Sequence, residues 1–97
     1  MRPRDHHIRF CRDHLPSAAE YWARHLGHLA GGGPWRTALC PLHGDKRPSL
    51  RVNVQSGAWR CMSCGAAGGD VLSFHMRRYG LPFVEAASDL GAVEVFS

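Results

Sequence analysis

The sequence predicts an α+β fold in which a small antiparallel β-sheet carries a metal site and is flanked by helices. Two ligand pairs, Cys40-Pro41-Leu42-His43 and Cys61-Met62-Ser63-Cys64, stand close together in a short chain. Between the pairs the apolar residues recur with a period of two, which is typical of strands. Capped helical patterns precede and follow this stretch. With 97 residues the chain is one small domain whose hydrophobic core is marginal without further support.

The residue types in the two pairs suit one zinc ion. Two ligands separated by two residues can bind the same ion from a tight turn, with sulfur at about 2.3 Å and nitrogen at about 2.0–2.1 Å. Together Cys40, His43, Cys61 and Cys64 give a tetrahedral Cys3His shell, and such a closed shell is typical of structural zinc. Thiolate ligands need a reducing compartment, so we expect a cytoplasmic protein with Zn²⁺ as its cofactor.

Two other assignments of the cysteines are open. The second pair has the spacing of a redox CxxC motif, although the CxxH motif upstream has no role in that chemistry. Cys11-Arg12-Asp13-His14 repeats the CxxH spacing, and the longer loop to Cys61 would cost only about 0.9 kcal/mol more. The turn chemistry favours the pair that begins at Cys40, because Pro41 stiffens the turn and Gly44 follows it.

The first third of the chain predicts an arm and a helix. Residues 1–15 are polar and predict a solvated N-terminal arm, and residues 16–97 predict the folded domain. Ser17 with Glu20 three residues later forms a capping-box pattern at a helix start. Three glycines at residues 31–33 are expected to end this helix. Its apolar stripe comprises Ala18, Trp22, Leu26 and Leu29.

Three short strands are predicted over residues 35–39, 49–54 and 58–61. In the middle strand Leu50 and Val52 share one face with Val54, and Ser49, Arg51 and Asn53 share the other. In the last strand Trp59 lies on the side of Cys61, whereas Arg60 points the opposite way.

The remainder of the chain predicts a flexible connection and two helices. The connection is the glycine-rich stretch of residues 65–69. Asp70 can cap a helix that runs to about Tyr79 and ends at Gly80. Pro82 opens a final helix that runs to Leu90.

The charge distribution favours a polyanionic partner. The formal net charge is +4, and three thiolates with one zinc would lower it to about +3. Residues 46–69 contain four cationic side chains and no acidic one, a pattern typical of nucleic-acid binding but also of an ordinary solvated face. Trp35 and Trp59 suit either core packing or base stacking. The predicted DNA-contact residues are Lys46, Arg47, Arg51, Asn53, Trp59 and Arg60.

Several motifs occur along the chain, namely Cys40-Pro41-x-His43, Lys46-x-Pro48-Ser49-Leu50-x-Val52, Cys61-x-x-Cys64-Gly65, Gly68-Gly69-Asp70-Val71 and Phe74. Together they resemble the CHC2-type zinc-binding domain of bacterial DNA primases, over roughly residues 17–91. The resemblance implies a zinc ribbon with flanking helices whose ligands are the four residues named above. It also implies binding of single-stranded template DNA, with contacts near Lys46, Arg51 and Arg60, and cooperation with a separate polymerase domain.

We therefore expect a primase-type module that is not an enzyme on its own. The chain lacks room for a magnesium-binding polymerase domain, so a polymerase or primase subunit would act in trans, with a helicase as a further potential partner. An alternative is a zinc-stabilised adapter that docks a helicase, a polymerase or a single-strand-binding protein. A zinc deaminase or hydrolase is disfavoured, because it needs an open metal position and an H-x-E motif. No stretch is apolar enough to span a membrane, and the N-terminus is too polar for a signal peptide.

Overall fold

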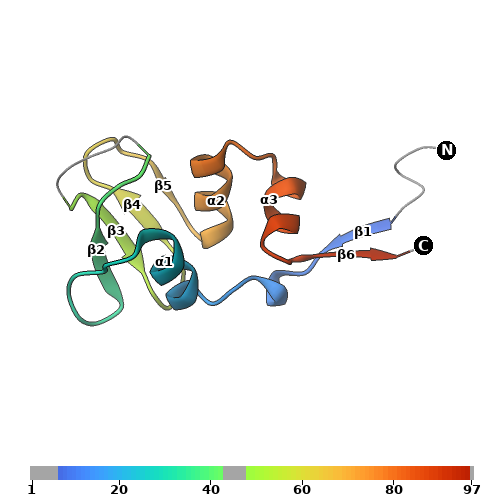
Figure 1. Cartoon of the computed structure of the whole chain (residues 1–97), viewed down its shortest axis with the longest axis horizontal. Helices are drawn as coiled ribbons and strands as arrows, with labels where there is room; N and C mark the ends of the chain where they lie inside the picture. Colours follow the sequence, from blue (N-terminus) through green and yellow to red (C-terminus); the bar gives the residue numbers. More distant parts are fainter. Residues whose placement is uncertain (1–6, 43–47, 97) are drawn as a thin grey trace.

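The computed structural model describes residues 7–42 and 48–96, and it confirms the α+β class (Figure 1). Four strands form an antiparallel sheet in the order β2-β3-β4-β5, and a separate two-stranded ribbon joins β1 to β6. No helix in these two ranges is long and apolar enough to cross a membrane. The elements are β1 (His7–Phe10), a 3₁₀ helix (Arg12–His14), α1 (Ala18–Leu26), β2 (Trp35–Ala38), β3 (Leu50–Asn53), β4 (Trp59–Cys61), β5 (Ala67–Gly68), α2 (Val71–Tyr79), α3 (Phe83–Asp89) and β6 (Val93–Phe96).

The main core lies between one face of the four-stranded sheet and helices α1 and α2. Leu50 and Val52 are fully buried, as the period of two in β3 predicts. Trp22 of α1 and Trp59 of β4 each pack edge-on against Phe74 of α2, with ring centroids 4.9 and 5.1 Å apart. Burial of each such side chain contributes roughly 1.5–3 kcal/mol, so the aromatic contacts fix both helices on this inner face.

Helix α1 starts where predicted and ends early. The hydroxyl of Ser17 accepts a hydrogen bond from the Glu20 backbone N–H (3.2 Å) and donates one to its carboxylate (2.9 Å). The helix ends at Leu26 because Gly27 adopts a positive φ of 75°. The expectation that it continues to the glycines at 31–33 is wrong, and Leu29 packs on the core from beyond the helix.

A buried histidine joins the three helices. His75 of α2 is hydrogen-bonded through Nδ1 to the Tyr21 hydroxyl of α1 (2.7 Å) and through Nε2 to the Asp89 carboxylate of α3. His25 stacks on Tyr21 with ring centroids 4.1 Å apart and is hydrogen-bonded to the Tyr79 hydroxyl. Both ring nitrogens of His75 are thus satisfied, as a buried polar side chain requires. His75 therefore holds α1 and α3 against α2 through its two hydrogen bonds.

The glycine-rich stretch of residues 65–69 is not a flexible connection as predicted, because part of it forms β5. Strand β5 pairs with β4, with Gly68 opposite Trp59 and Ala67 opposite Arg60. A Cβ atom on Gly68 would lie 2.2 Å from Ser73 Oγ and 2.6 Å from Trp59 Nε1. The same two atoms form a hydrogen bond of 2.9 Å. Glycine is therefore required here for a close approach of the backbone to the core.

The predicted solvated arm is also wrong for its described part. Strand β1 pairs with β6, and Phe10 packs edge-on against Phe83 of α3 at 5.0 Å. Arg12 forms an ion pair of 3.1 Å with Asp70, the residue that caps α2. Figure 1 shows this ribbon at the end of the molecule away from the four-stranded sheet. The division of the chain at residues 15 and 16 stays a prediction.

We predict that Gly68→Ala destabilises the fold by roughly 1–3 kcal/mol, because the added methyl group overlaps Ser73 and the Trp59 indole. Urea unfolding followed by circular dichroism measures the change. Gly69→Ala is the matched control, since its Cβ would meet no atom within 4 Å. Equal stability of the two variants would show that Gly68 is not the point of close approach.

Candidate metal centre

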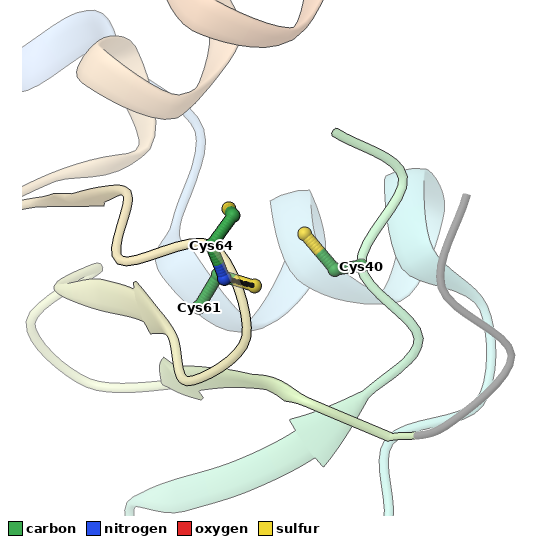
Figure 2. A group of neighbouring side chains, drawn as sticks. All are labelled: Cys40, Cys61 and Cys64. Atoms are coloured by element: carbon green, nitrogen blue, oxygen red, sulfur yellow. Dashed lines mark hydrogen bonds between the residues drawn. The ribbon is translucent and has the colours of Figure 1, made fainter. Parts of the chain in front are cut away.

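Three of the four predicted ligands converge at one end of the four-stranded sheet. Cys40 lies just beyond the end of β2, Cys61 is the last residue of β4, and Cys64 follows in the next turn. Their sulfur atoms all lie within 4.8 Å of one another. Figure 2 shows Cys40 on one chain segment facing Cys61 and Cys64 on the other. Cys40 and Cys61 are buried, and Cys64 is exposed.

The sheet topology explains the convergence. Strands β2 and β4 both pair antiparallel with β3, so they run in the same direction, and their C-terminal ends lie at the same end of the sheet. Leu50 at the start of β3 lies opposite Ala38 on one side and opposite Cys61 on the other. The cysteines at the ends of β2 and β4 are thereby brought to one place by backbone hydrogen bonding.

The second ligand pair sits in a tight turn. The backbone N–H of Gly65 donates to the Cys61 carbonyl (2.9 Å), and Gly65 has a positive φ of 79°. The N–H of Cys64 donates to the Cys61 sulfur at 3.5 Å. A hydrogen bond to sulfur favours the thiolate form, which is the form that binds metal.

Burial and the neighbouring thiols disfavour a free thiolate at Cys40, and a bound cation would stabilise that thiolate. Burial raises the pKa of the Cys40 thiol to about 12, and the neighbouring Cys61 and Cys64 also raise it. Without a metal ion the Cys40 thiol holds its proton at neutral pH, whereas a bound divalent cation would displace it. Sulfur atoms about 2.3 Å from a tetrahedral zinc lie ~3.8 Å apart, which the observed spacing accommodates. The three cysteines therefore fit zinc.

Two further residues, His43 and Cys11, are candidate metal ligands by sequence. His43, the predicted fourth ligand, lies outside the described residues. Cys11, of the competing CxxH motif, is hydrogen-bonded to the Glu94 carboxylate at 2.9 Å and takes no part in the cluster. Within residues 7–42 and 48–96, Cys40, Cys61 and Cys64 form the only group of three or more potential metal ligands.

The outer face of the four-stranded sheet carries two of the predicted DNA-contact residues. Arg51 and Arg60 are exposed and lie directly opposite each other on β3 and β4. No described carboxylate is within ion-pair distance of either guanidinium. Lys46 and Arg47 lie outside the described residues.

Two other predicted contacts have structural roles. Trp59 is 2% exposed, and its indole N–H is bonded to Ser73. Its prediction as a DNA contact is wrong, because the alternation along β4 turns it towards the core with Cys61. Asn53 is half-buried, and its side-chain oxygen accepts hydrogen bonds from the N–H groups of Gln55 and Ser56, so it stabilises the turn after β3.

Sequence reasoning did not place Trp35 and Met62 on the outer face. Trp35 is opposite Asn53 in the register, and the Arg51 guanidinium carbon lies 5.9 Å from its ring centroid. With Arg51 and Arg60, these two residues line a shallow hollow of about 400 Å³. The alternation from the buried Ala38 back to Trp35 is the signal that could have placed Trp35 outside.

We predict that Cys64→Ser loses most of the bound zinc and that Cys11→Ser keeps the wild-type amount. Cys64 is exposed, so its substitution removes a ligand with little change in packing. Elemental analysis of the dialysed proteins gives the zinc content of each variant. Equal loss in both variants would mean that Cys11 belongs to the metal site.

The comparisons with known proteins agree with this geometry. A family model described as the CHC2 zinc finger matches residues 28–95. A DNA primase of Geobacillus stearothermophilus is 48% identical over 54 residues, which are 56% of this chain and 9% of that protein. A DNA primase of Streptomyces coelicolor is 35% identical over 89 residues, covering 92% of this chain and 14% of that protein. The chain thus spans a small fraction of the length of these curated relatives.

A solved structure extends the similarity to the fold. A crystal structure of the Aquifex aeolicus primase, containing its zinc-binding and RNA polymerase domains, superposes with a TM-score of 0.66 at 26% identity. The match covers 78% of this chain and 18% of that one. The cysteine cluster, the antiparallel sheet and the matched family model lead to one conclusion: the chain belongs to the CHC2 zinc-finger family, the zinc-binding region of DNA primases.

Proposed function

We propose that this zinc-binding module holds single-stranded template DNA on the outer face of the β2–β5 sheet and acts with a polymerase domain during primer synthesis. The observation that carries the proposal is the exposed pair Arg51 and Arg60, which lie side by side on a sheet that ends at the metal centre.

The arginine pair supports an anionic partner on energetic grounds. Like charges directly opposite each other on antiparallel strands destabilise a sheet. Since no described carboxylate neutralises Arg51 or Arg60, a phosphate group between the two guanidinium groups would relieve the repulsion. The predicted contacts Lys46 and Arg47 extend the same charge along the chain, because they precede β3 by a few residues.

Zinc has a structural role in this proposal. With His43 as the fourth ligand, the shell is closed and offers no position for a substrate. Coordination ties the end of β2 to the end of β4, and β3 lies between them. The metal therefore keeps the arginine-bearing strands in register, and it does no chemistry itself.

The polymerase partner is inferred from the relatives. The DNA primases that resemble this chain are far longer, and the Aquifex structure contains an RNA polymerase domain besides its zinc-binding domain. We infer that the present module positions the template for such a domain, in trans, and does not synthesise primers alone. A reducing compartment such as the cytoplasm suits its thiolate ligands.

An adapter role is a second candidate, favoured by one observation. Phe83 and Val84 at the start of α3 are both exposed and lie outside the sheet face that carries the arginines. They could anchor a helicase, a polymerase or a single-strand-binding protein. Recovery of such a partner would then survive nuclease treatment, whereas recovery through DNA would not.

We predict that affinity for single-stranded DNA falls with salt at a log–log slope of about −2 to −3, as three or four neutralised phosphates require. Arg51→Gln/Arg60→Gln should weaken binding and reduce the slope by about 1.4, because two phosphate contacts of ~0.7 each are lost. Fluorescence anisotropy with a labelled oligonucleotide between about 50 and 200 mM salt measures both quantities.

Arg24→Gln/Arg77→Gln is the matched control, since it removes the same charge from exposed positions on α1 and α2. It should leave the slope nearly unchanged. Equal weakening in the two double variants, or binding that is insensitive to salt, would contradict the proposal.

A further inference from the structure

We propose that the hollow on the outer sheet face is a nucleotide subsite, in which one unpaired base stacks on Trp35 and an adjacent phosphate lies between Arg51 and Arg60. The inference rests on the proposed function and adds to it: it names the ligand of this hollow as a single nucleotide unit of an unpaired strand. It also predicts that recognition is tolerant of base identity.

Trp35 differs from the other two tryptophans of the chain. Trp22 and Trp59 are 0% and 2% exposed and pack on Phe74, whereas Trp35 is 41% exposed. The described contact of its ring is with the Arg51 guanidinium, outside the aromatic core. Aromatic side chains on a basic sheet face are the stacking platforms that single-stranded nucleic acids use.

The position of Arg51 prepares the hollow for a stacked base. Its guanidinium carbon lies 5.9 Å from the centroid of the Trp35 ring, within cation–π range. This contact holds the Arg51 guanidinium over one face of the Trp35 ring. A base that stacks on the opposite face of the indole would therefore have a cation already in place for an adjacent phosphate.

The pairing of Arg51 with Arg60 supplies the phosphate site. Directly opposite residues on antiparallel strands have Cβ atoms about 4.5–5.5 Å apart, so both guanidinium groups can reach one phosphate. Arginine also presents a planar set of donors that matches phosphate geometry. The two guanidinium groups repel each other in the free protein, and both would bind an anion that lies between them.

The lining of the hollow determines what it can recognise. The hollow of about 400 Å³ is lined by Trp35, Arg51, Arg60 and Met62, and the Met62 side chain is 62% exposed. These side chains offer hydrogen-bond donors, an aromatic face and a polarizable thioether, but no carbonyl or carboxylate acceptor. Asn53, the nearest amide in the register, has its oxygen engaged in the turn.

It follows that the subsite reads the face of a base and the charge of its phosphate. Every base has such a face, so discrimination among bases should be weak. A duplex hides its base faces by stacking, so the hollow should select unpaired strands. An acidic peptide would satisfy the two arginines but would leave Trp35 without a stacked partner.

Intrinsic fluorescence tests the subsite, because Trp35 is the one exposed tryptophan among the three in the chain. The zinc-bound full chain is titrated with a thymidine oligonucleotide and with an abasic strand of the same length. We expect the thymidine strand to quench the emission and the abasic strand to bind at least about fivefold more weakly without quenching. A duplex of the same length should behave like the abasic strand.

Variants of Trp35 separate stacking from folding. Trp35→Ala should bind the thymidine strand as weakly as the wild type binds the abasic strand, and Trp35→Tyr should restore most of the affinity. If both strands bind the wild type equally and without quenching, while Arg51→Gln/Arg60→Gln still weakens binding, the subsite is refuted and the proposed function stands. If no single strand binds at all, both fall together.

Discussion

The coordination of one metal ion by two turns far apart in the sequence is the constraint on which the rest of the structure depends. The four-stranded sheet is narrow, and its last strand, β5, has two residues. A hydrophobic core of this size adds little net stability once the conformational entropy of the chain is counted. Structural zinc adds an apparent ~10–16 kcal/mol of binding free energy that is coupled to folding. The cysteine cluster therefore decides whether the sheet keeps its register.

One face of that sheet forms the hydrophobic core, and the other carries the proposed DNA-binding residues. The inner face is closed by α1 and α2 through contacts of Trp22 and Trp59 with Phe74. The outer face has no helix over it among the described residues, and it presents Arg51, Arg60 and Trp35. Because side chains alternate along a strand, a single register places the cysteine and tryptophan of β4 inside and its arginine outside. Metal binding and the proposed DNA binding are thus linked through backbone pairing.

Local signals predicted much of this arrangement. The spacing of the cysteines identified the metal cluster, and the caps at Ser17 and Asp70 identified the starts of two helices. The period of two in the apolar residues identified β2, β3 and β4 as strands. The burial of Trp59 also follows from that period, since it lies two residues from Cys61 on the same face, and this burial conflicts with its prediction as a DNA contact.

Non-local pairing was the part that the sequence did not reveal. Strand β1 pairs with β6 from the opposite end of the chain, and the short alternation in each strand, His7-Ile8-Arg9-Phe10 and Val93-Glu94-Val95, does not indicate its partner. Strand β5 depends on the absence of a side chain at Gly68, which reads as flexibility until the contact with Trp59 is known. The exposure of Trp35 likewise depends on its register with Asn53. Each of these features is set by a distant partner and not by the residues themselves.

The most direct test of this account is removal of the metal from the wild-type chain. Near-ultraviolet circular dichroism reports the packing of Trp22 and Trp59 against Phe74, in the same core cluster as Cys40 and Cys61. We expect a chelator to remove more than half of this signal and added zinc to restore it. A protein shown by elemental analysis to be free of metal, yet retaining most of its native signal, would contradict the central claim.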